Sequence, residues 1–115
     1  MDKRIKARWV KALRSGKYKK AIGALKVVDI QTGKASYCCL GVLCDLHSKS
    51  AKGEKWAGEA DCHYHGNDML LPCVVQDWAK LDDLSSEVKG VELTDFNDHQ
   101  GYSFKKIATL IEKYL

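Results

Sequence analysis

Two Cys-x-x-His pairs are the residues whose types and spacing could hold a metal ion. The first pair is Cys44 and His47, and the second is Cys62 and His65. Two thiolates and two imidazoles can complete a tetrahedral zinc site, and residues three apart on a helix share a face. One reading is therefore a small interaction domain with zinc as its cofactor. The other is that no cofactor binds, because Cys44 is a buried thiol in an apolar run and His47 is solvated.

Cysteine also raises the question of thiol catalysis. Cys38 and Cys39 stand where a predicted strand ends and a predicted helix begins, and a helix N-terminus lowers the pKa of a thiol. In an enzyme Cys39 would be the nucleophile and His99 its base, oriented by Asn97 or Asp98. Neither cysteine has the local signature of a known thiol protease, and adjacent cysteines ahead of an apolar helix are typical of a core. We therefore expect a non-catalytic protein.

The first twenty residues form a strongly basic segment. They hold nine Lys or Arg against one Asp, a charge of +8, whereas the remainder holds ten basic and fourteen acidic residues, a charge of −4. Nucleic-acid binding through this segment is one hypothesis, and a solvated helix face with Trp9 turned inward is the other. No helix-turn-helix or RNA-binding signature supports the first. The binding residues predicted here are Lys3, Arg4, Arg8 and Lys11.

A second predicted binding surface is the polar turn at residues 95–101, which carries Asn97, Asp98 and His99. Side chains of the Asx type in such a turn are expected to hydrogen-bond nearby backbone amides. Asp98 and His99 could also form an acid and base pair in a pocket. Local hydrogen bonding is the commoner role of an Asn-Asp turn ahead of a helix, so we treat these residues as a binding surface.

Length and composition place the chain among small globular proteins. With 115 residues and 45% hydrophobic residues, it is long enough for a single domain with a real core. It has no run of eighteen apolar residues, so we expect no membrane span, and its charged start does not resemble a secretory signal. Its five cysteines show no regular disulfide spacing. We expect reduced thiols and a cytoplasmic location.

Hydrophobic periodicity predicts the elements that position these residues. Helices are expected over 3–15, 39–49, a short stretch opened by Leu71-Pro72, and 103–115 behind the N-cap Ser103. A β-hairpin is expected over 21–39, and short strands are expected at 55–56 and 91–94. Residues 48–70 are predicted to be an irregular surface loop, and 82–90 a second loop. The predicted fold is α+β, with about four helices around a small antiparallel sheet.

The centre of this arrangement is the nearly uncharged stretch at residues 37–46. Its apolar positions fit a buried helix, with the thiols as filler among larger side chains. The residues expected to dominate the core here are Leu40, Val42, Leu43 and Leu46.

Several short motifs together resemble a family of small uncharacterised proteins of tailed bacteriophages and prophages. The motifs are Trp9-x-x-Ala12-Leu13-Arg14-Ser15-Gly16-x-Tyr18, Tyr37-Cys38-Cys39-Leu40-Gly41-Val42-Leu43-Cys44-Asp45-Leu46, Leu71-Pro72, Trp78-Ala79, Asn97-Asp98 and Phe104-x-x-Ile107-Ala108-x-x-Ile111-Glu112. The chain departs from the family at Phe96, where Leu is expected, and in its histidine-bearing loop.

The resemblance implies a phage accessory protein that acts inside an infected bacterial cell, and it implies no catalytic residues. Together with the weak catalytic motifs, it leads us to expect a binding protein. The expected partner is a host or defence-system component, either a protein or a small nucleotide-like ligand. The motifs do not specify an oligomeric state.

Overall fold

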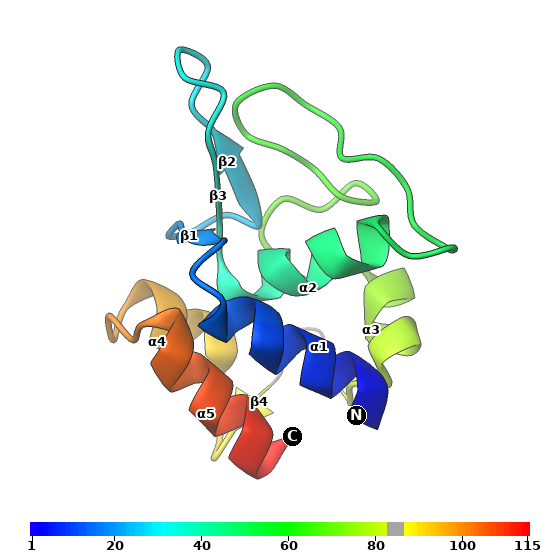
Figure 1. The fold of residues 1–115 in the computed structure, drawn as a ribbon, viewed down its shortest axis with the longest axis vertical. Coiled ribbons are helices and arrows are strands. Elements are labelled where there is room, and N and C mark those ends of the chain that lie inside the picture. Colours follow the sequence, from blue (N-terminus) through cyan, green and yellow to red (C-terminus); the bar gives the residue numbers. More distant parts are fainter. Residues whose placement is uncertain (83–86) are drawn as a thin grey trace.

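A central helix, α2 (Cys39–Ser48), organises the fold in the computed structural model, which describes residues 1–82 and 87–115. It packs against α1 (Lys3–Arg14), α3 (Cys73–Ala79) and α4 (Leu93–Asp98), and Figure 1 shows it between α1 and the sheet. Its first seven residues are all buried. The stretch at 37–46 is therefore the core, as its composition predicts, although Leu46 is only half-buried.

Two local features explain where α2 begins and why its third residue, Gly41, is a glycine. The Sγ of Cys38 caps the helix by accepting a hydrogen bond from the backbone N–H of Gly41 at 3.3 Å. A Cβ on Gly41 would lie 1.7 Å from the carbonyl oxygen of Leu25. The helix and the chain at Leu25 thus touch backbone to backbone, which only glycine permits.

Helix α1 has its predicted extent and its predicted inward face. The carboxylate of Asp2 caps it by accepting from the N–H groups of Arg4 and Ile5, and the chain leaves it through Gly16 at φ +76°. Trp9 is fully buried, and its Nε1 donates a hydrogen bond to the carbonyl of Cys39 at 3.0 Å. The prediction that Trp9 turns into the core is confirmed.

The predicted hairpin forms a small mixed sheet. Strands β2 (Lys26–Val28) and β3 (Ala35–Tyr37) pair antiparallel, and β1 (Lys19–Lys20) adds to β3 in parallel. The strand β1 was not predicted, because two lysines carry no strand signal. Residues 60–62 run along the free edge of β2, where Val28 N–H donates to the carbonyl of Ala60 and Cys62 N–H to that of Lys26. The irregular loop thereby covers an otherwise open strand edge.

The loop at 48–70 is less exposed than predicted. It contains Tyr64, which is fully buried, and Cys62, which is 4% exposed. The predicted strand at 55–56 is wrong, because only an isolated bridge forms there, between Ala57 and His63.

The C-terminal part contains one helix, α4, that was not predicted. Strands β4 (Glu87–Val88) and β5 (Val91–Glu92) form a second antiparallel pair, and α4 begins directly after β5. The strand predicted at 91–94 is therefore only two residues long. Half of the predicted turn at 95–101 is helical, because Leu93, Phe96 and Asn97 together bury one face. The loop predicted at 82–90 falls partly on 83–86, outside the described residues.

Helix α5 (Phe104–Tyr114) closes the fold and lies beside α1 (Figure 1). Ser103 caps it as predicted, by accepting from the N–H of Lys106, and Phe104, Ile107 and Ile111 are buried. The α+β class is confirmed, with five helices in the described residues instead of about four. None of these helices has the length and apolar character needed to cross a bilayer.

Candidate functional site

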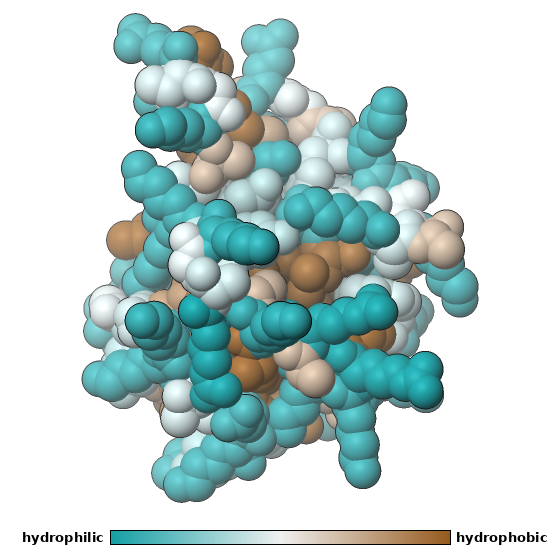
Figure 2. Space-filling view, in the orientation of Figure 1, coloured by the Kyte–Doolittle hydropathy of each residue, from teal (hydrophilic) through white to brown (hydrophobic). Residues whose placement is uncertain are grey.

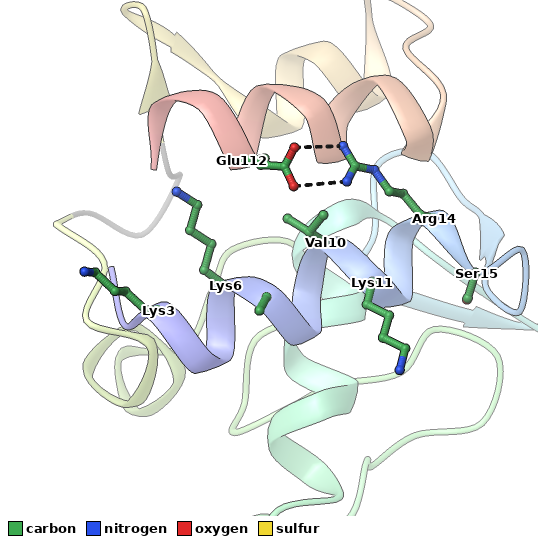
Figure 3. A pocket seen from close by; sticks show the side chains of 8 residues that line it. Lys3, Lys6, Val10, Lys11, Arg14, Ser15 and Glu112 are labelled. Carbon is green, nitrogen blue, oxygen red and sulfur yellow. Dashed lines mark hydrogen bonds and ion pairs between the residues drawn. The ribbon is translucent and has the colours of Figure 1, made fainter.

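The solvent-facing side of α1 carries a shallow basic groove. The groove has a volume of about 670 Å³ and runs along α1 beside the end of α5 (Figure 3). Figure 2 shows hydrophilic side chains over α1 with apolar patches between them. The lining residues combine four cations, two apolar side chains, one hydroxyl and one carboxylate: Lys3, Lys6, Ala7, Val10, Lys11, Arg14, Ser15 and Glu112.

Helical geometry explains how one short segment makes both a core face and a charged groove. Ile5, Trp9 and Leu13 face inward at steps of four residues. Val10 lies at the margin of that buried face, 6% exposed, and forms the apolar floor with Ala7. The lysines flank this floor, so a bound molecule would meet apolar and positively charged groups together.

An ion pair between two helices fixes one end of the groove. The Arg14 guanidinium donates to both carboxylate oxygens of Glu112, at 3.1 and 3.4 Å, and also to the Thr109 hydroxyl. Both charged side chains are exposed, 39% for Arg14 and 60% for Glu112, so the pair adds little stability. Its effect is to hold Arg14 in place and to put a negative charge at the α5 side (Figure 3).

The predicted cationic residues divide into two groups on α1. Lys3 and Lys11 line the groove, whereas Arg4 and Arg8 are exposed on the same helix but do not line it. The sequence reasoning missed Lys6, Arg14 and the two apolar floor residues. Together with Lys3, these residues stand at positions 3, 6, 7, 10 and 14, a spacing that puts them on one face of a helix. The sequence could therefore have indicated this face of α1. Glu112 carried no such signal, because it comes from the opposite end of the chain.

In the second predicted surface Asn97 is buried, Asp98 is half-buried and His99 is exposed. Asn97 is fully buried, and its Nδ2 donates to the carbonyl of Ala21 at 2.9 Å and to the Asp98 carboxylate. Its Oδ1 has no hydrogen-bond partner among the described residues. His99 is exposed and lies 3.0 Å from the Asp95 carboxylate. In the described part of the chain, Asn97 binds a distant carbonyl and Asp98, and His99 pairs with Asp95; the predicted Asx bonds to nearby backbone amides are not among these contacts.

The thiols of α2 are not arranged for nucleophilic attack. Cys39 is fully buried, and its Sγ contacts the carbonyl of Leu93 at 3.7 Å. Burial raises the pKa of Cys39 well above its usual value and that of Cys38 to about 11. The expected lowering by the helix N-terminus is outweighed by loss of solvent. The proposed base, His99, is paired with Asp95 at the surface.

The structure does not assemble the candidate zinc ligands. In residues 1–82 and 87–115 no three His, Cys, Asp or Glu side chains gather as a metal site. Cys44 is buried in the core, while the Sγ of Cys62 lies 3.7 Å from the carbonyl of Glu59. His65 approaches the carboxylate of Glu54 at 3.6 Å.

His47 is not the solvated residue that the sequence suggested. It is 1% exposed, and its Nδ1 lies 2.6 Å from the hydroxyl of Tyr64. The rings of Tyr64, His65 and Trp78 surround it, with ring centres 5.0–5.9 Å away. Burial lowers the pKa of His47, and the neighbouring His65 lowers it further. His47 is therefore a structural residue held neutral near pH 7.

A buried carboxylate on α2 was missed by sequence reasoning. Asp45 is 6% exposed and accepts hydrogen bonds from the Tyr18 hydroxyl at 2.6 Å and from Trp56 Nε1 at 3.2 Å. Lys49 adds an ion pair at 2.9 Å. Burial alone would raise the pKa of Asp45, but the hydrogen bonds of Tyr18 and Lys49 outweigh it and lower the pKa. Asp45 thus connects α2 to Tyr18, which precedes the sheet, and to Trp56 in the 48–70 loop.

Comparisons with known proteins give a family. A family model described as a domain of unknown function (DUF8296) matches residues 1–115. No curated protein and no solved structure matches the chain.

Proposed function

The chain belongs to the DUF8296 family over its whole length, and from that premise we propose that it is a non-catalytic binding protein whose α1 groove holds an anionic partner. The observation that carries the proposal is the groove itself. Three lysines and Arg14 line the groove together with Ala7 and Val10, and the one carboxylate in its lining is Glu112, which pairs with Arg14. A surface with this charge attracts an acidic partner and speeds its association.

The state of the thiols supports a role in binding over one in catalysis. The cysteine best placed for attack, Cys39, is buried and protonated, and His99 is held elsewhere by Asp95. Nucleophilic catalysis needs an accessible thiolate within reach of a base. The alternative of a thiol enzyme therefore lacks its main requirement. The zinc-stabilised interaction domain lacks a gathered ligand set among the described residues.

The biological setting of the proposal rests on the motif resemblance. The resemblance implies a protein that acts inside an infected bacterium, so the proposed location is the host cytoplasm. The proposed partner is a component of the host or of a defence system. An acidic protein and a small nucleotide-like ligand both carry negative charge that the lysines of the groove would attract.

Nucleic-acid binding is the second candidate. It is favoured by Arg4 and Arg8, which extend the positive charge of α1 beyond the groove. Phosphates along a backbone would use such a wide basic face. Binding of this kind weakens steeply as salt rises, whereas binding into an apolar floor weakens less.

Charge reversal tests the proposal. One variant carries Lys3→Glu, Lys6→Glu and Lys11→Glu. A matched control carries Lys34→Glu, Lys52→Glu and Lys55→Glu, which make the same change in net charge at exposed positions outside α1. The natural chain and both variants serve as baits in infected bacterial cells, and captured proteins and nucleotides are quantified.

We expect the α1 variant to lose its captured partner about ten-fold or more, as for a charge-dependent interface, while the control retains it. Equal capture by both variants contradicts the proposal. Capture dominated by nucleic acid, with a steep salt dependence, favours the second candidate.

A further inference from the structure

We propose that the α1 groove accepts an acidic amphipathic helix of a partner protein. The inference rests on the proposed function and narrows its occupant to one kind. An amphipathic helix in a groove presents apolar side chains at steps of three and four residues and keeps its polar face outward. The groove offers an apolar floor between positive side chains, which is complementary to such a helix.

The floor is the first reason for this choice. Ala7 and Val10 lie three residues apart, both line the groove, and neither carries a polar side-chain atom; Val10 is 6% exposed. Ala7 is exposed, so a partner side chain can reach it. Covering these side chains removes apolar surface from water, which stabilises a complex only when the occupant is apolar too. A phosphate backbone would gain nothing from this floor.

The free lysines are the second reason. Among residues 1–82 and 87–115, Lys3, Lys6 and Lys11 have no carboxylate within 4.0 Å. Arg14 is already bound to Glu112 and Thr109. The cations left for a partner are thus lysines, compact charges on flexible stems that can follow carboxylates at helical spacing.

The aromatic residue of α1 is the third reason. Single-stranded nucleic acids are commonly held by bases stacked on exposed aromatic rings. Trp9 is the aromatic residue of α1, and it is fully buried with its Nε1 bonded to Cys39. The groove therefore combines positive charge with aliphatic contact and has no stacking platform from α1.

The length of the groove sets the length of its occupant. Helix α1 has 12 residues, and at a rise of about 1.5 Å per residue it is about 18 Å long. A partner helix of about three turns covers it. Glu112 repels carboxylates at the α5 side, so the acidic positions of the partner should meet Lys3, Lys6 and Lys11 instead (Figure 3).

A display selection with random 16-residue peptides tests the inference. Peptides retained by the natural chain are counter-selected against Ala7→Glu, which places a charge on the exposed floor. We expect the enriched peptides to be acidic, with apolar residues at steps of three and four. The best peptide, a sequence-shuffled version of it and a single-stranded thymidine oligonucleotide are then compared by fluorescence anisotropy.

Single substitutions on one helix serve as matched controls. Lys6→Glu lies in the groove and Arg8→Glu lies outside it, with the same change in charge. We expect Lys6→Glu to weaken peptide binding about ten-fold and Arg8→Glu less than about three-fold. The reason is that Lys6 would touch the peptide, whereas the charge of Arg8 acts through solvent that screens it. Circular dichroism confirms that each variant is folded.

Three outcomes overturn the inference: equal binding of the shuffled peptide, enriched peptides without acidic excess or helical period, and tighter binding of the oligonucleotide. If capture from cells still depends on the α1 lysines, only the helical occupant is wrong. If neither assay depends on them, the proposed function is wrong as well.

Discussion

The hydroxyl of Tyr64 lies 2.6 Å from Nδ1 of His47, and both side chains are buried. Tyr64 also accepts a hydrogen bond from the backbone N–H of Glu54 at 3.2 Å. When His47 is neutral with its proton on Nε2, the Tyr64 hydroxyl can donate to Nδ1; a protonated imidazole has no lone pair to accept with, so protonation removes that bond. This contact joins the 48–70 loop to the central helix.

The contact predicts a loss of stability in acid. Burial lowers the pKa of His47 below its ordinary value of 6.5, so the unfolded chain binds a proton there before the folded chain does. The free energy of unfolding then decreases as pH falls below 6.5 and recovers as pH rises. Urea denaturation at pH 5 and pH 7.5 measures it. His47→Gln should flatten this dependence; an unchanged slope in that variant would contradict the assignment.

Removing the hydroxyl of Tyr64 tests the same contact at neutral pH. Tyr64→Phe leaves the buried Nδ1 of His47 without its partner and removes the acceptor of the Glu54 N–H, and should cost about 1–3 kcal/mol. Denaturation of Tyr64→Phe, His47→Gln and the double variant forms a cycle that isolates the coupling. Additive effects of the two substitutions would show that the contact contributes nothing.

Gly41→Ala should be among the most destabilising single changes in the chain. The new methyl group would lie 1.7 Å from the Leu25 carbonyl oxygen, so α2 and the hairpin must separate. We expect a loss of about 3 kcal/mol, at the upper end for overpacking. Gly33→Ala is the control, since its Cβ meets nothing within 4 Å and only its φ of +72° is strained. There the expected cost is about 1 kcal/mol. Thermal melts of both variants measure the difference.

The thiols should differ sharply in reactivity. Cys73 is exposed, whereas Cys38, Cys39 and Cys44 are buried with raised pKa values. Iodoacetamide at pH 8 should therefore modify Cys73 first and reach the three core cysteines only after unfolding. Peptide mass spectrometry at successive times gives the order. Rapid labelling of Cys39 in the folded chain would reopen the possibility of thiol catalysis.

Patterns local in sequence were reliable guides to this fold. The apolar period of 3–15 predicts α1, and Gly16 predicts its end, because both depend on neighbouring residues alone. The N-cap Ser103 and the stripe of α5 were predicted for the same reason. The strand β1 could not be predicted, since two lysines become a strand only when β3 lies alongside. The helix α4 was missed because the polar residues of 95–98 resemble a turn.

The candidate site was predicted in part. Lys3 and Lys11 follow from the exposed face of a basic amphipathic helix. Arg14 was not among the predicted binding residues, yet it lines the groove and pairs with Glu112, 98 residues away. His47 was expected to be a zinc ligand or a solvated residue and Asn97 part of a binding surface, although both are buried. Polarity alone does not report burial, because a buried polar group needs only a partner.

The sequence by itself determined the α+β class, the central apolar helix and the positive charge of the first helix. These follow from composition and period, which are properties of short segments. Only the tertiary structure decided which polar side chains are buried and which cations border an apolar floor. Such placements depend on contacts between residues far apart in the chain, such as Tyr64 with His47 and Glu112 with Arg14. Those contacts form only when the helices and the loop pack around α2.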